Sequence, residues 1–221
     1  MARVTVIIVA AGEGQRYGAP KQFVPLAGKP VLEWCLESFE THVQVAKIIL
    51  VLISDVQKID YMERYKKVTH VIPGGAHRQD SVFAGFNLID PSETDYVLIH
   101  DGVRPLVSHD LISRVIQAVK QSGAAIPVIP IEDTVKLIQG DKILETLDRT
   151  KIRRVQTPQG FSYQVLKMAL SRARDEEYYG TDEAALVERM GGEVFLVDGD
   201  PKNIKITTPE DLRIAEALSE D

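Results

Sequence analysis

Cysteine, positive net charge and long apolar runs are scarce in this sequence, and each shortage excludes a class of protein. Cys35 is the single cysteine among 221 residues, which excludes an internal disulfide and a cysteine-based zinc site. The formal net charge is -6, so any polyanion must be met by a local cluster of cations. The longest apolar runs, VTVIIVAA and AKIILVLI, are too short to cross a bilayer. We therefore expect a cytoplasmic enzyme or binding protein that engages neither nucleic acid nor a membrane.

Short β-branched runs alternate with helical patterns along most of the chain. The runs that predict strands are 3–10, 46–53, 68–72, 95–101, 124–131 and 193–198. The patterns that predict helices are 30–40, 55–65, 78–89, 108–122, 161–176, 181–191 and 208–220. This alternation predicts one α/β domain over residues 1–221, with a mainly parallel sheet flanked by helices on both faces.

The alternation breaks after Pro130. The segment DTVKLIQGDKILETLDR predicts two strands around the turn QGDK, without an apolar face of its own. A lone two-stranded hairpin is marginally stable in water. We therefore expect residues about 133–155 to form a protruding β-arm that leans on another surface, such as a second subunit.

A loop rich in small residues follows the first predicted strand. Ala10, Ala11 and Gly12 would let a ligand approach the backbone, whose N–H groups can form an anion nest. Arg16 and Lys21 add two cations beside this loop, and guanidinium and ammonium groups both bind phosphate. The spacing fits neither the dinucleotide nor the Walker fingerprint, and a plain strand-to-helix turn is the alternative interpretation. The two cations favour a phosphate site.

Two further stretches combine a turn with polar side chains. In IPGGAHRQDSV, Gly75 ends a strand, and Arg78 and Ser81 share one face of the next helix. A turn followed by a capped helix explains that stretch equally well. In LIHDGVRP, Asp101 follows a buried strand, at the sheet edge where open α/β folds bind ligands. Its carboxylate is a candidate ligand for a divalent cation or a substrate hydroxyl, and Arg104 is a candidate anion contact or its ion-pair partner.

Ordinary structural roles explain three other features. His100 has no evident nucleophile beside it and is expected to be a structural residue. Thr181 is expected to cap a helix whose first turn holds Asp182 and Glu183. The basic residues between 149 and 154 are typical of a solvated face.

Read together, seven segments resemble the 2-C-methyl-D-erythritol 4-phosphate cytidylyltransferase family of the non-mevalonate isoprenoid pathway. They are AAGEGQRYG with PKQF, PGGAHRQDSV, HDGVRP, DTVK, TPQGF, GTDEAALVE and GDPKNIKITTPEDL. The resemblance implies a Rossmann-like nucleotidyltransferase domain that transfers CMP from CTP to the polyol phosphate and releases pyrophosphate. It also implies magnesium or another divalent cation, and a homodimer formed through the β-arm.

The resemblance also assigns roles to individual residues. Arg16 and Lys21 match the catalytic cations that stabilise charge on the triphosphate. The positions around the cytidine and triphosphate are Ala10, Ala11, Gly12, Gly75, Arg78 and Ser81. The positions that face the acceptor are Asp101, Arg104, Thr134, Thr157 and Thr181, with Arg149 and Lys205 on its phosphate. Arg149 is expected to reach the active site of the neighbouring subunit.

Two departures and two alternatives accompany this interpretation. The family commonly has an acidic residue near Ala76 or His77, and DAAR where this chain has DGVR, so we expect Gly102 to loosen that turn. A ribitol 5-phosphate cytidylyltransferase would share the nucleotide half of the sequence. A catalytically inactive nucleotide sensor on the same scaffold is the second alternative.

Overall fold

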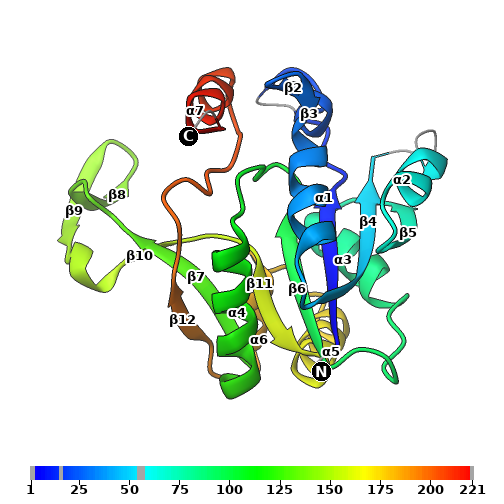
Figure 1. Ribbon diagram of the computed structural model, residues 1–221. Coiled ribbons are helices and arrows are strands. Elements are labelled where there is room, and N and C mark those ends of the chain that lie inside the picture. The colour runs from blue at the N-terminus through cyan, green and yellow to red at the C-terminus, as the bar shows by residue number, and fades with distance from the viewer. Residues whose placement is uncertain (1–2, 15–16, 54–57, 220–221) are drawn as a thin grey trace.

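A twisted central sheet organises the molecule (Figure 1). The computed structural model describes residues 3–14, 17–53 and 58–219. The strands of the main sheet run in the order β10-β7-β11-β6-β1-β4-β5, and β12 also pairs with β7. Their bounds are β1 Val4–Ala10, β4 Val45–Leu52, β5 Val68–Pro73, β6 Tyr96–Asp101, β7 Ala124–Pro130, β10 Arg153–Val155, β11 Gln159–Ser162 and β12 Phe195–Asp198.

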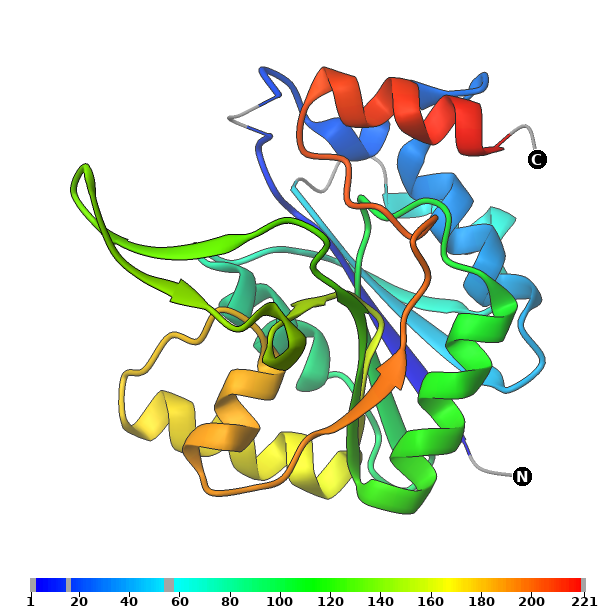
Figure 2. The same ribbon diagram turned by 90° about the vertical axis from the view of Figure 1, so that its left-hand side faces the viewer.

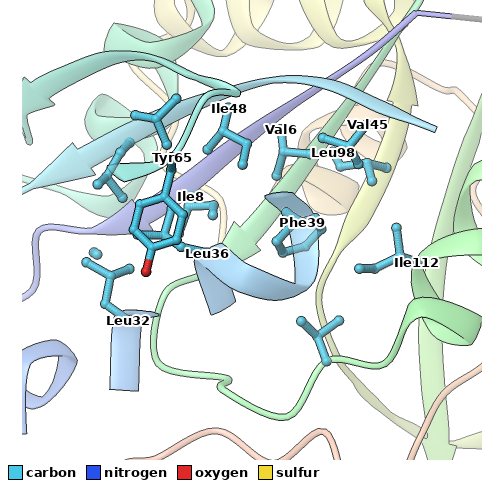
Figure 3. Close-up of a cluster of buried hydrophobic side chains, with 14 of the residues drawn as sticks. Val6, Ile8, Leu32, Leu36, Phe39, Val45, Ile48, Tyr65, Leu98 and Ile112 are labelled. Carbon is cyan, nitrogen blue, oxygen red and sulfur yellow. The ribbon is translucent and has the colours of Figure 1, made fainter. Parts of the chain in front are cut away.

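Helices cover both faces of this sheet, as the alternating pattern predicts. Their bounds are α1 Val31–Thr41, α2 Lys58–Arg64, α3 Arg78–Phe86, α4 His109–Ser122, α5 Tyr163–Asp175, α6 Glu183–Arg189 and α7 Pro209–Ser219. Alternate residues of β1 enter different cores, because successive side chains of a strand point to opposite faces. Val6 and Ile8 pack with α1, α2 and α4 (Figure 3), whereas Ile7 packs with α3, α5 and α6. The expected α/β architecture is therefore confirmed.

The sheet departs from a purely parallel arrangement at β11. This short strand lies between β6 and β7 and is antiparallel to both. Sequence patterns did not predict it, because its four residues contain no β-branched run. Gly160 explains its position: a Cβ there would stand 2.8 Å from Val115 and 3.1 Å from Leu98. The strand therefore depends on close backbone packing rather than on local propensity.

The predicted hairpin protrudes from the body of the molecule (Figure 2). It consists of β8 (Val135–Gln139) and β9 (Lys142–Leu147), which pair with each other and form a separate sheet. A short 3-10 turn, η3 (Arg149–Lys151), follows it, and β10 then returns to pair with β7. The last residues of the expected arm, 153–155, thus belong to the main sheet.

A smaller cluster joins the N-terminal loops to the C-terminal helix. The connecting elements are the 3-10 turn η1 (Lys21–Phe23) and the short paired strands β2 (Pro25–Leu26) and β3 (Lys29–Pro30). Tyr17, Trp34 and Ile204 pack around a core that includes Leu26 and Ala215 of α7. The start of α7 is a capping box: Thr208 N–H donates to Asp211 Oδ2 at 2.8 Å, and Asp211 N–H donates to Thr208 Oγ1 at 3.4 Å. Among the described helices, none has the length and apolarity needed to span a bilayer.

Candidate active site

A cavity of about 690 Å³ opens where β1, β5 and β6 end. Because parallel strands present their carboxyl ends at one edge of a sheet, loops distant in sequence converge there. Nine of the residues singled out in the sequence line this cavity: Ala10, Ala11, Gly12, Lys21, Gly75, Arg78, Ser81, Asp101 and Lys205. Arg16, the other expected catalytic cation, lies outside the described residues.

Backbone constraints shape the loop after β1. Gly14 has a φ of 71°, a conformation that other residues rarely adopt, and a Cβ there would collide with Ala19 O. Gly14 O accepts hydrogen bonds from Tyr17 N–H at 2.8 Å and from Gly18 N–H at 2.9 Å. On the other side, Gln22 Nε2 donates to Gly12 O at 3.2 Å. These contacts fix the described residues of the loop next to Lys21.

The second glycine-rich turn is fixed by Ser81. Its hydroxyl accepts a hydrogen bond from Gly75 N–H at 3.1 Å and donates to His77 O at 3.2 Å. A Cβ on Gly75 would collide with the side chain of Asp80. Ser81 is only 2% exposed, so it shapes the cavity wall mainly through the backbone of the turn.

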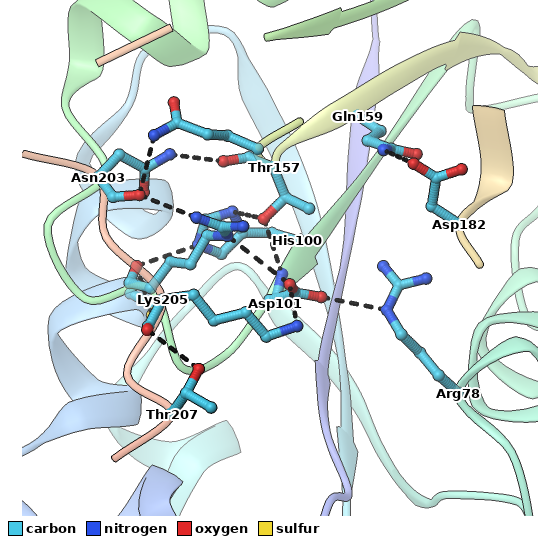
Figure 4. Close-up of polar contacts among 12 residues, drawn as sticks. Arg78, His100, Asp101, Thr157, Gln159, Asp182, Asn203, Lys205 and Thr207 are labelled. Atoms are coloured by element: carbon cyan, nitrogen blue, oxygen red, sulfur yellow. Dashed lines mark hydrogen bonds and ion pairs between the residues drawn. The ribbon is translucent and has the colours of Figure 1, made fainter. Parts of the chain in front are cut away.

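Asp101 is the centre of a charge cluster (Figure 4). Its Oδ2 lies 3.0 Å from Lys205 Nζ and 3.6 Å from Arg104 Nε, and its Oδ1 accepts from Arg78 Nε at 3.1 Å. Burial alone would raise the pKa of the Asp101 carboxyl, but the charges of Arg78, Lys205 and Arg104 outweigh it and hold the pKa below its usual range. Asp101 is therefore an ionised carboxylate shared by three cations.

A buried hydrogen-bond chain supports Asp101 from behind. Asp101 N–H donates to Thr157 Oγ1 at 3.1 Å, and Thr157 Oγ1 lies 3.1 Å from His100 Nδ1. His100 Nε2 lies 3.2 Å from Arg104 O, which can only accept, so Nε2 carries the proton and Nδ1 accepts from the threonine. Burial lowers the pKa of the fully buried His100 to about 4, so the ring is neutral at pH 7. The expected structural role of His100 fits this geometry.

Hydrogen bonds also connect the loop that carries Lys205 to this buried network. Arg104 Nη1 donates to Asn203 O at 2.9 Å, and Asn203 Nδ2 donates to Thr157 O at 2.8 Å. Arg104 and Thr157 are 9% and 5% exposed, so both act behind the cavity surface rather than on it. Their expected contact with the acceptor stays a prediction; in the structure, both hold residues that face the cavity.

Three predicted acceptor residues lie away from the cavity wall. Thr134, Arg149 and Thr181 are exposed, and none of them lines the cavity. Arg149 sits at the base of the hairpin, where its guanidinium donates to Glu132 O. The structure of one chain therefore does not bring these residues together with Asp101.

The region around α6 departs from the sequence interpretation in two ways. Asp182, not Thr181, caps the helix, because its carboxylate accepts from Ala185 N–H at 3.0 Å. Glu183, expected only to fill the first turn, is 1% exposed and pairs with Arg78. The sequence did not indicate that Glu183 is buried, because acidic residues in the first turn of a helix are usually exposed and interact favourably with the helix dipole.

Gly102, expected to loosen its turn, is closely packed instead. Its N–H donates to Val9 O at 2.9 Å, and a Cβ would stand 2.8 Å from Ala10 Cβ. In this chain the DGVR sequence lets β1 and the turn after β6 approach each other at the cavity floor.

Comparisons with known proteins agree over the length of the chain. The 2-C-methyl-D-erythritol 4-phosphate cytidylyltransferase family matches residues 4–221. The enzymes of that name from Bacillus cytotoxicus and Pelotomaculum thermopropionicum are 43% and 41% identical, over 97% and 99% of this chain and 96% and 94% of theirs. Crystal structures of the Thermus thermophilus and Francisella tularensis enzymes superpose with TM-scores of 0.84 and 0.85 at 36% and 32% identity, covering 100% and 98% of this chain and 100% of each structure. With its charge cluster and cavity at the sheet edge, the chain belongs to the 2-C-methyl-D-erythritol 4-phosphate cytidylyltransferase family.

Proposed function

We propose that this protein transfers CMP from CTP to 2-C-methyl-D-erythritol 4-phosphate and releases pyrophosphate. The relatives that carry this name match it over nearly the whole chain, and the cavity supplies the parts that the reaction needs. The observation that carries the proposal is the cavity itself, which joins Lys21 and a small-residue loop on one side to Asp101 and Lys205 on the other. These two sides suit a triphosphate and a polyol phosphate.

The reaction requires positioning and charge stabilisation rather than a covalent nucleophile. A phosphate oxygen of the acceptor attacks the α-phosphorus in line, and pyrophosphate leaves. Arg16 and Lys21 stabilise the negative charge that develops on the triphosphate. The backbone of Ala10, Ala11 and Gly12, with Gly75, holds the nucleotide. Ser81, the one cavity-lining serine among the described residues, is already hydrogen-bonded to the turn and acts as a structural contact.

Asp101 and Lys205 hold the acceptor. The Lys205 side chain is 39% exposed and keeps donors for a phosphate while it pairs with Asp101. The ionised Asp101 carboxylate accepts from a polyol hydroxyl. Arg104 and Thr157 keep Asp101 in place, and Thr134, Thr181 and Arg149 complete the acceptor side.

We expect a divalent cation to be held at this site mainly by the nucleotide phosphates. Among the described residues, no group of three or more His, Cys, Asp or Glu side chains is arranged to hold a metal ion. Asp101 is a candidate ligand, but three cations already share its charge. Mg²⁺ tolerates a site with few protein ligands because it retains waters and binds substrate phosphates. When bound through the CTP phosphates, magnesium neutralises part of their charge.

A homodimer through the β-arm accounts for the residues that one chain leaves outside the cavity. Contrary to the expectation that the hairpin has no apolar face of its own, it exposes Ile138, Ile143 and Leu144 at 63%, 64% and 57%, apolar side chains that a monomer would leave in water. If this surface packs on a second copy, Arg149 at its base reaches the partner's acceptor site. That arrangement gives the exposed arm and the distant arginine a common purpose.

Pyrophosphate release with CTP and magnesium tests the proposal. We expect turnover with 2-C-methyl-D-erythritol 4-phosphate and much slower turnover with ribitol 5-phosphate. Faster use of ribitol 5-phosphate would reassign the acceptor. Binding of CTP without pyrophosphate release from any polyol phosphate would show instead that the protein is a nucleotide sensor.

A further inference from the structure

Glu183 is a buried carboxylate that the proposed reaction does not use. It begins α6, far in sequence from the nucleotide loop, and its side chain is 1% exposed. Both of its carboxylate oxygens accept from Arg78 Nη1, each at 2.8 Å. A buried charge with a single strong partner generally serves that partner, because ionic burial is costly without pairing.

Arg78 is held at two of its three guanidinium nitrogens. Nη1 donates to Glu183, and Nε donates to Asp101 Oδ1 at 3.1 Å. Among the described residues, none accepts a hydrogen bond from Nη2. Arg78 lines the cavity with 28% of its side chain exposed, so Nη2 is the nitrogen that remains for a ligand. Two carboxylates thus fix the orientation of a planar donor.

The start of α6 is itself fixed, which makes Glu183 a rigid anchor. Asp182 accepts from Ala185 N–H with one oxygen and from Gln159 Nε2, at 2.7 Å, with the other (Figure 4). Gln159 Oε1 in turn accepts from Ala184 N–H at 3.2 Å. Glu183 therefore stands between two residues that are bound to β11.

The loop that enters α6 is tied to the helix of Arg78 as well. Gln79 Nε2 donates to Tyr178 O, and its Oε1 accepts from Gly180 N–H, each at 2.9 Å. Tyr179 donates to Asp80 Oδ1 at 3.3 Å. The first turn of α3 and the loop that enters α6 are consequently held together by three hydrogen bonds.

We infer that Glu183 is a positioning residue for the nucleotide: it acts through Arg78, leaving only the Nη2 donors to meet CTP. This inference rests on the proposed function. Without Glu183 the guanidinium keeps Asp101 as its anchor but loses the second one, and it can turn away from the nucleotide. The residue touches no substrate itself, so its effect falls on nucleotide binding rather than on the chemical step.

The test is Glu183→Gln, which keeps the size of the side chain and removes its charge. We expect the KM for CTP to rise about tenfold, with kcat and the KM for the acceptor changed less than about twofold. Loss of a negative charge alone would favour an anionic nucleotide, so a purely electrostatic role predicts a lower KM. The matched control is Glu188→Gln, an exposed glutamate of the same helix, which should leave all three constants unchanged.

A double-mutant comparison separates positioning from a general structural role. In an Arg78→Gln background, Glu183→Gln should add no further increase in the KM for CTP. An additive increase, or an unchanged or lower KM in the single variant, would overturn the inference while wild-type turnover still supported the proposed function. A wild-type protein without cytidylyl transfer would instead overturn the function.

Crystals of the wild-type protein with CTP provide a readout that does not depend on the folding of any variant. Arg78 Nη2 should contact the nucleotide while Nη1 remains on Glu183. A complex in which that pair is broken, or in which Nη2 points away from the nucleotide, contradicts the inference.

Discussion

The two sides of the cavity that we assign to the nucleotide and to the acceptor are built in different ways. On the nucleotide side, Ala10, Ala11, Gly12 and Gly75 lie at or just after the ends of parallel strands, and all of them line the cavity. On the acceptor side, Asp101 and Lys205 line it, whereas Thr134, Arg149 and Thr181 are exposed elsewhere. Parallel strand ends converge because of the sheet topology, so one chain completes that half. An arm that leaves the sheet has no such constraint, and we propose that a second copy completes its half.

The largest expected effect lies on the nucleotide side. Lys21→Ala and Arg16→Ala should each lower kcat by about 10²- to 10³-fold, the usual cost of removing one preorganised charge-stabilising donor. Steady-state pyrophosphate release measures this, with circular dichroism to show an intact fold. Lys66→Ala, the loss of an exposed lysine far from the cavity, is the control and should retain wild-type turnover. Unchanged turnover in either active-site variant would remove that residue from the mechanism.

The acceptor side is tested by Arg149→Ala. Loss of a charged hydrogen bond to the acceptor phosphate should raise the acceptor KM about ten- to hundredfold and leave the KM for CTP unchanged. Lys142→Ala, at the exposed turn of the same hairpin, is the matched control.

Mixing variants shows whether the arm crosses between subunits. Random exchange of Arg149→Ala with Lys21→Ala chains makes half of the dimers mixed, each with one intact site, so about a quarter of wild-type activity should return when the acceptor concentration is kept well below the KM of the Arg149→Ala variant. If the activity stays at the level of the separate variants, Arg149 acts in the site of its own chain. Both sides of the cavity would then be built by a single chain.

The smallest effect is expected where the two sides meet, at His100 and Thr157. Burial lowers the pKa of His100 to about 4 in the folded protein, against about 6.5 in the unfolded chain. Between these values the unfolded state binds the proton and the folded state does not, so stability falls as the pH falls. Between pH 8 and pH 5 this residue should contribute a loss of about 2 kcal/mol.

Denaturant unfolding of His100→Asn at both pH values measures that contribution. The variant should be less stable than the wild type at pH 8 but lose about 2 kcal/mol less on acidification. His70→Asn, which removes an exposed histidine, should keep the wild-type loss. If His100→Asn loses as much unfolding free energy between pH 8 and pH 5 as the wild type, protonation of His100 does not cause the loss.

The sequence was sufficient for the features that depend on local patterns. Strand and helix alternation predicted the sheet and its two helical layers, and the small-residue loop that drew attention in the sequence lines the cavity together with Lys21. The turn QGDK predicted the hairpin, because its flanking strands alternate on either side of Gly140. Such signals are carried by neighbouring residues and need no knowledge of the tertiary structure.

The features that sequence reasoning missed all depend on contacts between distant segments. Gly160 and the strand β11 are explained by Val115 of α4 and Leu98 of β6, which lie far away in the chain. In the sequence, Glu183 resembles any acidic residue at the start of a helix. Its burial is explained only by its ion pair with Arg78, which lies 105 residues earlier in the chain. The burial of Thr157 likewise follows from its bonds to Asp101 and His100. No local pattern distinguishes these residues from exposed ones.

Trp34 gives the protein a built-in optical reporter. It is the only tryptophan of the sequence, its indole N–H donates to Leu26 O at 3.0 Å, and Lys29 Nζ lies 3.9 Å from its ring centre. Its ring shares a cluster with Tyr17, in the loop after β1, and with Ile204, next to Lys205. We therefore expect the emission of this one chromophore to respond to both of these loops, without labels and in real time.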